Sequence, residues 1–376
     1  MEPEEAGRWP SCTKGASLAA PKLESGMSAP TLSVVMSVYN AAPFLDAAIS
    51  SVLIQSFPDF EFLIVDDGST DDSTSIIRAH AAKDSRILPV LRENRGLIAS
   101  LNELLDLARA PLIARMDADD ICAPERFAKQ IRFLADHPDY GVVGSQVDHI
   151  DEHARPFPLA NGTYPASHAD VLCAIAEHKP VLCHPAVMFR REAVLAVGGY
   201  HAAFRHCEDL DLWLRLANIT RITNLPERLL RYRHYAGQVS FRHALEQQTG
   251  AALARVAYRT RIAGMPDPTA DLDTIPQLDE LDALFGQAGI AREVRGQVAR
   301  ALLYSPIGLG GEGFDLLLRH LDEGGTHHGM WRTVARLVRF GMPVRALRLA
   351  AGLIASRPSG ATTSAPAPPP ALTARP

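Results

Sequence analysis

The segment Pro111-Leu-Ile-Ala-Arg-Met-Asp-Ala-Asp-Asp-Ile-Cys-Ala-Pro124 organises the chain on either side of it. Its apolar run, Leu112 to Met116, predicts a buried strand, and Pro124 predicts the start of a helix. Between them lie Asp117, Asp119 and Asp120. Acidic residues that follow a strand of a parallel sheet lie at the edge where open α/β folds bind ligands.

Asp117 and Asp119 form an Asp-x-Asp pair of hard oxygen ligands, which Mg²⁺ and Mn²⁺ prefer. A cation held by this pair would bridge the phosphates of a substrate. The alternative is a solvated acidic turn in which an Asp caps the following helix. The rest of the chain decides between the two.

Strand and helix patterns alternate before this segment. The predicted strands cover residues 32–40, 60–65 and 87–91, and the predicted helices cover 45–53, a segment capped by Asp71 or Asp72, and 96–109. Such alternation is typical of an α/β fold with a mostly parallel sheet flanked by helices.

Asp66 and Asp67 follow the second predicted strand, and Tyr39 and Asn40 end the first. Right-handed crossovers make parallel strands point the same way, so these residues should share one edge with Asp117 and Asp119. An aromatic ring, a carboxylate able to accept from a base N–H and a metal-binding pair suit a nucleoside diphosphate. The chain has no G-x-x-x-x-G-K-[ST] and no G-x-G-x-x-G motif, which argues against NTPases and dinucleotide enzymes.

Several motifs resemble, in order and spacing, the family 2 glycosyltransferases of the GT-A fold. They are Val34–Asn40, Ile64–Thr70, Asn94–Gly96, Met116–Asp120, His184–Arg190, Gly198–Tyr200, Glu208–Arg215 and Gln238–Ser240, and they span about Thr31 to Phe241. The resemblance implies a Rossmann-like half that binds a nucleotide-diphosphate sugar, with a uridine donor favoured. It also implies inversion at the anomeric carbon.

The resemblance assigns roles to single residues of this chain. The donor nucleotide would be bound by Tyr39, Asn40, Asp66, Asp67, Asn94, Gly96 and Asp117, and the metal, Mn²⁺ or Mg²⁺, by Asp117 and Asp119. Asp209 would be the catalytic base, with Glu208 supporting it. An inverting transfer needs one base to take the acceptor's proton. A carboxylate at a helix N-terminus should stay ionised at neutral pH, although acidic residues there are often simple complements of the helix dipole.

Further candidates for the acceptor side or a mobile loop are His184, Asp211, Arg233, His234 and Gln238. His184 could equally hydrogen-bond a loop. The basic segment that contains Arg233 and His234 could close over the diphosphate or simply be solvated.

Composition limits the other function classes. The net charge is −5, which gives no reason to expect nucleic-acid binding. The five cysteines contain no Cys-x-x-Cys pair, which favours reduced thiols in a cytoplasm. Cys183-His184 and His206-Cys207 lack the ligand spacing of a zinc set.

The domain boundaries follow from the same patterns. We expect a disordered extension over 1–30, a GT-A catalytic domain over 31–241, a helical region over 242–355 and a disordered Pro/Ala-rich tail over 356–376. The helical region should hold segments at 245–262, 278–289 and 292–303 and two more up to Ile354.

The end of the helical region is basic. No Asp or Glu follows Glu323, while Arg332, Arg336 and Arg339 share one helical face opposite Trp331 and its apolar neighbours. A basic amphipathic helix is typical of peripheral contact with an anionic membrane. The alternative is a helix packed on the catalytic domain with a solvated Arg face.

Together these features predict a cytoplasmic, metal-dependent, inverting glycosyltransferase, peripheral at the inner face of the cell membrane. Its acceptor would be a saccharide or a lipid-linked glycan of a cell-surface polysaccharide. One alternative is a member of the family that binds nucleotide sugars without transfer. The other is a nucleotidyltransferase, which also uses paired Asp residues and Mg²⁺.

Overall fold

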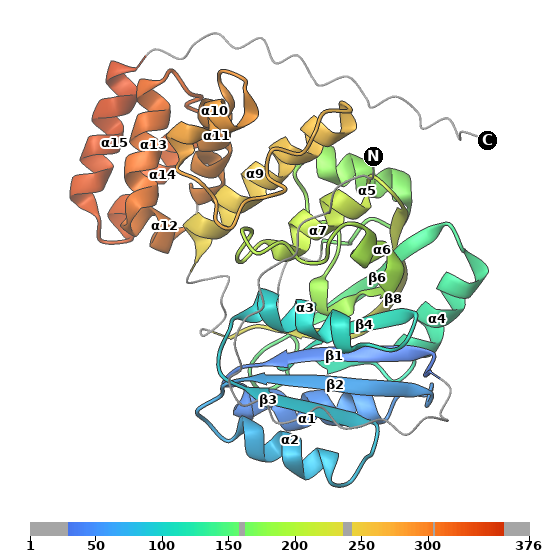
Figure 1. Ribbon diagram of the computed structural model, residues 1–376. Helices are drawn as coiled ribbons and strands as arrows, with labels where there is room; N and C mark the ends of the chain where they lie inside the picture. The colour runs from blue at the N-terminus through green and yellow to red at the C-terminus, as the bar shows by residue number, and fades with distance from the viewer. Residues whose placement is uncertain (1–28, 158–161, 236–242, 304, 357–376) are drawn as a thin grey trace, which may run out of the picture.

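The computed structural model describes residues 29–157, 162–235, 243–303 and 305–356. Its centre is one eight-stranded sheet with the order β3-β2-β1-β4-β7-β6-β8-β5 (Figure 1). The strands are β1 Leu32–Val38, β2 Phe60–Asp67, β3 Ile87–Arg92, β4 Leu112–Asp117, β5 Ile121–Cys122, β6 Tyr140–Ile150, β7 Met188–Arg190 and β8 Arg221–Arg233. Gln238 and nearly all of the two terminal segments expected to be disordered lie outside the described residues.

Parallel pairing brings the acidic strand ends to one edge. β1 pairs in parallel with both β2 and β4, which sets Val38 beside Asp66 and Ser37 beside Asp117. β7 is antiparallel to β4 and β6, and β5 is antiparallel to β8, so the sheet is mixed. The predicted α/β fold with a flanked sheet is confirmed.

Helices cover both faces of the sheet because its strands are apolar on both sides. Val34 and Met36 of β1 pack with α1 Ala42–Leu53, α2 Ser73–Ala81 and α4 Arg126–Asp136. Val35 points the other way, toward α3 Leu97–Leu107, α5 His168–Ala176, α6 Arg191–Ala196 and α7 Glu208–Leu216. Period-two alternation within one strand thus supplies two cores.

Helix α4 begins two residues later than the sequence suggested. Pro124 was expected at its start, but the helix runs from Arg126 with Glu125 as its N-cap. Pro124 instead lies in the turn before the helix, and its carbonyl oxygen accepts a hydrogen bond from the amide of Ser56 at 2.8 Å.

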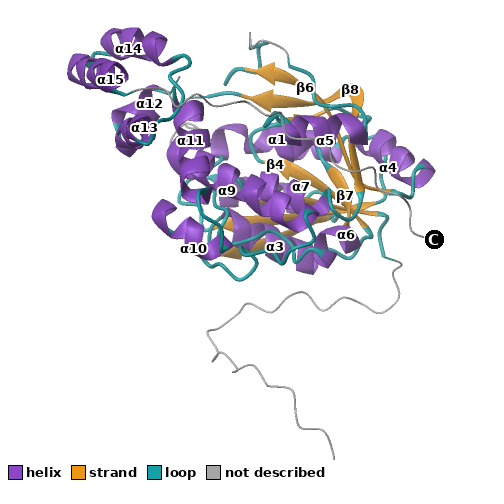
Figure 2. Ribbon diagram, turned by 90° about the horizontal axis from the view of Figure 1, so that it is seen from above, coloured by secondary structure: helices purple, strands orange, loops and turns teal. Residues whose placement is uncertain are grey.

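The C-terminal helices divide into two groups. α9 Ala244–Ile262, α10 Leu281–Phe285 and α11 Ile290–Leu302 share an apolar core with α7. α12 Pro306–Gly310, α13 Glu312–Asp322, α14 Met330–Arg339 and α15 Pro343–Ala355 have a core of their own and lie beyond α9 and α11 from the sheet (Figures 1 and 2). Among the residues described after Leu303, the structure has four helices where two were expected. Within the described residues, every helix is too short or too polar to cross a membrane.

Candidate active site

Three carboxylates gather where β4 ends. Asp117 is the last residue of the strand, and Asp119 and Asp120 lie in the turn that leads to β5. Their ligand oxygens all lie within 4.8 Å of one another. The buried guanidinium of Arg115 forms an ion pair with the Asp117 carboxylate at 2.5 Å.

The charges of this group are only partly neutralised. Burial, followed by the charge of Asp117, raises the pKa of Asp119 to about 6. Burial and the charges of Asp119 and Asp117 raise the pKa of Asp120 well above its usual range. One oxygen of Asp120 accepts from the backbone amide of Arg233 at 2.8 Å, while its buried Oδ2 has no hydrogen-bond partner. Clustered hard oxygens with excess negative charge and one orphaned oxygen fit a divalent cation.

The predicted base-binding acids are engaged by their own chain. Asp66 accepts from the amide of Ser69 at 3.0 Å and from the hydroxyl of Thr74. Asp67 accepts from the amides of Arg95 and Gly96, both at 2.8 Å, and forms an ion pair with Arg92. Both carboxylates are buried and fix the loops that surround the site.

Asn40 and Asn94 also hold these loops. Asn40 has a positive φ of 49° and accepts from the amide of Thr70 at 2.8 Å. Asn94 donates to the carbonyl of Asp67 at 2.9 Å. Tyr39 differs from both because 55% of its surface is exposed at the end of β1. Among the predicted nucleotide-binding residues, Tyr39 therefore has a ring free to stack on a base.

Glu208 and Asp209 form the first turn of α7. Glu208 is buried, whereas Asp209 is partly exposed and accepts from the amide of Leu210 at 2.7 Å. Burial and the charge of Asp209 raise the pKa of Glu208 to about 7, and burial also raises the pKa of Asp209. The expectation that the helix N-terminus keeps such a carboxylate ionised is therefore wrong for Glu208, because desolvation outweighs the helix dipole.

The two acidic groups lie in one electrostatic environment. The charge of Asp117 raises the pKa of both Glu208 and Asp209, and the Arg115 guanidinium lowers both. The end of β4 and the start of α7 are therefore close enough for their charges to interact, although 91 residues of sequence separate Asp117 from Glu208.

Two acceptor-side candidates are buried and bonded to neighbouring side chains. The His184 ring is bonded to the Tyr200 hydroxyl at 2.9 Å, and burial lowers its pKa well below the usual value. Asp211 forms a buried ion pair with Arg215 at 2.7 Å, one helical turn along α7. Both residues stabilise the packing around α7 in this structure.

Arg233 lies against the carboxylates, whereas the His234 ring packs against other rings. Arg233 is the last residue of β8, not part of a loop, because β8 pairs with β6 up to Ile150. Its guanidinium donates to the carbonyls of Asp119 at 2.6 Å and Asp151 at 3.0 Å. The His234 ring stacks on Phe157 with centroids 4.8 Å apart.

Comparison with known proteins identifies the chain. A family model described as glycosyl transferase family 2 matches residues 33–198. The amylovoran biosynthesis glycosyltransferase AmsE of Erwinia amylovora is 32% identical over 221 residues, which cover 56% of this chain and 79% of that protein. The chain belongs to glycosyltransferase family 2.

Other relatives agree with this assignment. The putative glycosyltransferase EpsE of Bacillus subtilis is 35% identical over 50% of this chain and 67% of that protein. Among solved structures, S. aureus TarS 1–349 in complex with UDP-GlcNAc aligns with a TM-score of 0.53 and 16% identity, over 86% of this chain and 91% of TarS 1–349. The structural likeness shows the shared fold.

Sequence reasoning assigned no role to three residues near the site of this glycosyltransferase: Arg115, Asp120 and Tyr235. Arg115 is a charge inside an apolar strand, which is a readable signal because buried charges require a partner. Asp120 was noted in the acidic segment but not assigned as a ligand. Tyr235 hydrogen-bonds the Asp119 side chain, and no spacing in the sequence indicates that contact.

Proposed function

We propose that this enzyme transfers a sugar from a nucleoside-diphosphate sugar to a hydroxyl group of a saccharide or lipid-linked acceptor, with inversion at the anomeric carbon. The observation that supports this most strongly is the carboxylate cluster at the end of β4, whose ligand oxygens lie within 4.8 Å of one another, beside a second set of acids in the first turn of α7. One group of acids is suited to a diphosphate and its cation, and the other to the acceptor hydroxyl.

The donor would lie along the carboxyl edge of the sheet. Tyr39 would stack on the base, while Asn40, Asn94 and Gly96 would contact the nucleoside from the loops that Asp66 and Asp67 stabilise. Asp117 and Asp119 would hold Mn²⁺ or Mg²⁺, which would supply positive charge to the departing diphosphate. Asp120 lies close enough to contribute a third oxygen.

Asp209 would act as the general base. Its partly exposed carboxylate would accept the proton of the acceptor hydroxyl while that oxygen attacks the anomeric carbon. The bond between this carbon and the diphosphate oxygen breaks, and the nucleoside diphosphate leaves with the electron pair. Attack from the face opposite the leaving group inverts the configuration. Glu208 would remain protonated over more of the neutral range and hold the first turn of α7.

The relatives support a polysaccharide acceptor. AmsE is named for amylovoran biosynthesis and WbnJ of Escherichia coli for O-antigen biosynthesis. TarS, which shares the fold, is described with UDP-GlcNAc, so uridine donors are the first to test. We place the catalytic domain over 31–241 and the helical region over 242–355, working in the cytoplasm at the inner membrane face.

A product assay tests the function. The full-length protein is incubated with UDP- and GDP-sugars and saccharide acceptors, with Mn²⁺, Mg²⁺ or EDTA. We expect acceptor-dependent release of nucleoside diphosphate that EDTA abolishes. Release of pyrophosphate would instead indicate nucleotidyl transfer, and donor binding without release with every acceptor would indicate a catalytically silent member.

A further inference from the structure

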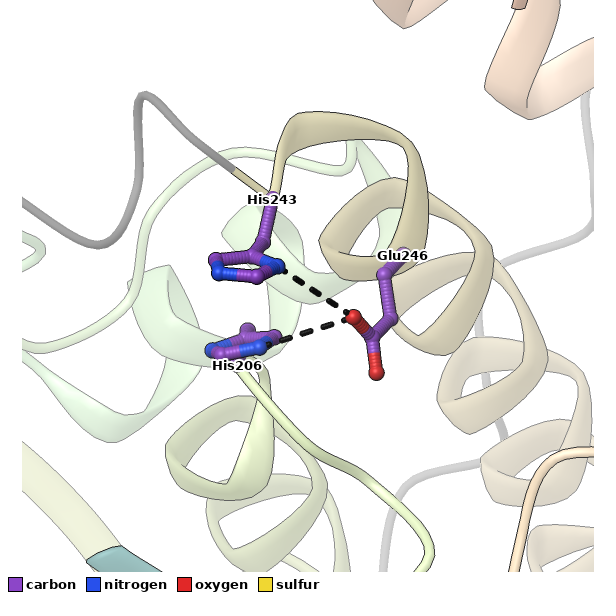
Figure 3. A group of neighbouring side chains, drawn as sticks. All are labelled: His206, His243 and Glu246. Carbon is purple, nitrogen blue, oxygen red and sulfur yellow. Dashed lines mark ion pairs between the residues drawn. The ribbon is translucent and has the colours of Figure 1, made fainter. Parts of the chain in front are cut away.

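A second group of potential metal ligands lies away from the carboxylates of β4. It consists of His206, in the turn before α7, and His243 and Glu246, at the start of α9 (Figure 3). The two histidines are 37 residues apart in sequence, and Figure 3 shows both rings turning a nitrogen toward the Glu246 carboxylate.

The distances approach those of a transition-metal site. Nε2 of His206 and Nδ1 of His243 each lie 3.5 Å from Oε2 of Glu246, and the three atoms lie within 4.8 Å of one another. Ligands about 2.0–2.1 Å from a tetrahedral Zn²⁺ are roughly 3.4 Å apart. Both nitrogen–oxygen separations already match that value. The two rings now stack at 4.1 Å, so the histidines would rotate to point their lone pairs at one ion.

The backbone holds the three side chains together. His206 has a positive φ of 64°, which is uncommon for a residue other than glycine, and its carbonyl accepts from the Gln247 side chain at 3.0 Å. His243 is the N-cap of α9, and Glu246 lies in the first turn of the helix. The backbone therefore already places the three residues side by side, and binding an ion would require only that the two rings rotate.

The group is also accessible and has the appropriate chemistry. About half of the His243 and Glu246 side chains is exposed, and both residues line an open cavity of about 370 Å³. The His206 ring is itself partly exposed, with about a quarter of its side chain accessible. Solvent or another donor could supply a fourth ligand through the cavity.

We propose that His206, His243 and Glu246 bind a transition-metal ion such as Zn²⁺, separately from the divalent cation at Asp117 and Asp119. Two imidazoles and one carboxylate favour borderline metals, whereas the all-oxygen cluster favours Mg²⁺ or Mn²⁺. The ion would tie α9 to the turn that leads directly into Glu208 and Asp209. Its role is structural: it stabilises the junction of the catalytic and helical regions.

The test uses tag-free, full-length protein and ZnCl₂. Zn²⁺ affinity is measured by competition with a chromophoric chelator, and the melting temperature is measured with and without Zn²⁺. His206→Asn tolerates positive φ, and Glu246→Gln keeps the side-chain shape. His178→Asn is the matched control because His178 also has a positive φ, 59°, and is exposed. Asp119→Ala removes the other site.

We expect His206→Asn and Glu246→Gln to weaken Zn²⁺ binding by at least about tenfold and to lose the Zn²⁺-dependent rise in melting temperature. His178→Asn and Asp119→Ala should keep both. Glu246→Gln decides the matter if His206→Asn fails to fold. Equal Zn²⁺ affinity in wild type and Glu246→Gln, or binding that only Asp119→Ala removes, would overturn the proposal and leave the group as an ion pair.

Discussion

At the scale of single residues, buried negative charge dominates the site. Asp119 and Asp120 are desolvated and repel each other and Asp117, which raises the pKa of both. Arg115 offsets part of this charge through its ion pair with Asp117. A bound cation would therefore stabilise the negative charge of the cluster and displace the protons from Asp119 and Asp120.

Asp119→Ala should abolish the effect of Mn²⁺ on donor binding, because the diphosphate loses its counter-ion. The loss of transition-state stabilisation should be several kcal/mol, on the order expected for a metal contact. Calorimetry with donor, with and without Mn²⁺, measures the effect of the metal on donor affinity. Asp136→Ala on the exposed face of α4 is the control. A mutant whose donor affinity still rises with Mn²⁺ would rule out Asp119 as a ligand.

Glu208→Gln should stabilise the metal-free fold at high pH. The folded-state pKa of Glu208 is raised from 4.5 to about 7, so the folded state binds more protons than the unfolded state between these values. The free energy of unfolding of the wild type therefore falls as pH rises from 4.5 through 7. Gln avoids that loss because it does not ionise.

Melting temperatures in EDTA test this prediction. The mutant should melt above wild type at pH 8, with the difference shrinking toward pH 4.5. Glu192→Gln, in the exposed first turn of α6, should show no such trend. A difference independent of pH would mean that Glu208 ionises normally.

The sequence could predict which residues reach the site edge, but not which of them are already bonded. Strand ends follow from apolar patterns, so Asp66, Asp67 and Asp117 were placed correctly at one edge. The hydrogen bonds from Arg92 and Gly96 to Asp67 join residues that are 25 and 29 positions apart in the sequence. They depend on loop geometry. The Asp211–Arg215 pair, by contrast, has readable i,i+4 spacing.

At the scale of elements, the last two helices expose an apolar face. Val344, Leu347 and Ile354 of α15 are 69%, 73% and 77% exposed, and they lie on one helical face. On α14, Trp331 and Val338 are also exposed, beside Arg332 and Arg339. Apolar and basic side chains of this kind suit an anionic membrane surface.

The double variant Leu347→Glu/Ile354→Glu should lose binding to anionic vesicles, because it removes apolar contact and adds repulsion. Co-sedimentation at low and high salt measures this, and salt should weaken wild-type binding. Ile54→Glu, equally exposed but at the end of α1, is the control. Unchanged sedimentation of the double variant would leave α14 and α15 as a packed cap and favour a soluble acceptor.

The number of C-terminal helices was the weakest sequence prediction, for a physical reason. α12 has only five residues, and glycine occurs at 308, 310, 311 and 313. Helical periodicity cannot be detected over so short a glycine-rich stretch. By contrast, α9 and α11 carry long apolar patterns and were found within two residues of their ends.

At the scale of the whole molecule, the site is assembled from two distant parts of the chain. The alternation of strands and helices up to β4 predicted the parallel half of the sheet that ends at the Asp117 cluster. The antiparallel strand β7 could not be predicted, since it has only three residues. Yet β7 pairs with β4, and its Phe189 shares an apolar core with Leu212 and Trp213 of α7.

Under the proposed function, donor binding and transfer use different residues, and Asp209→Asn tests that claim most directly. Asn keeps the shape of the side chain and removes the proton acceptor. We predict donor affinity equal to wild type in calorimetry and a transfer rate lowered about 10²-fold or more, the scale of a positioned general base. Donor binding that collapses in parallel with the rate would contradict the account, and the base would then have to be Glu208, because Asp211 is buried in its ion pair with Arg215.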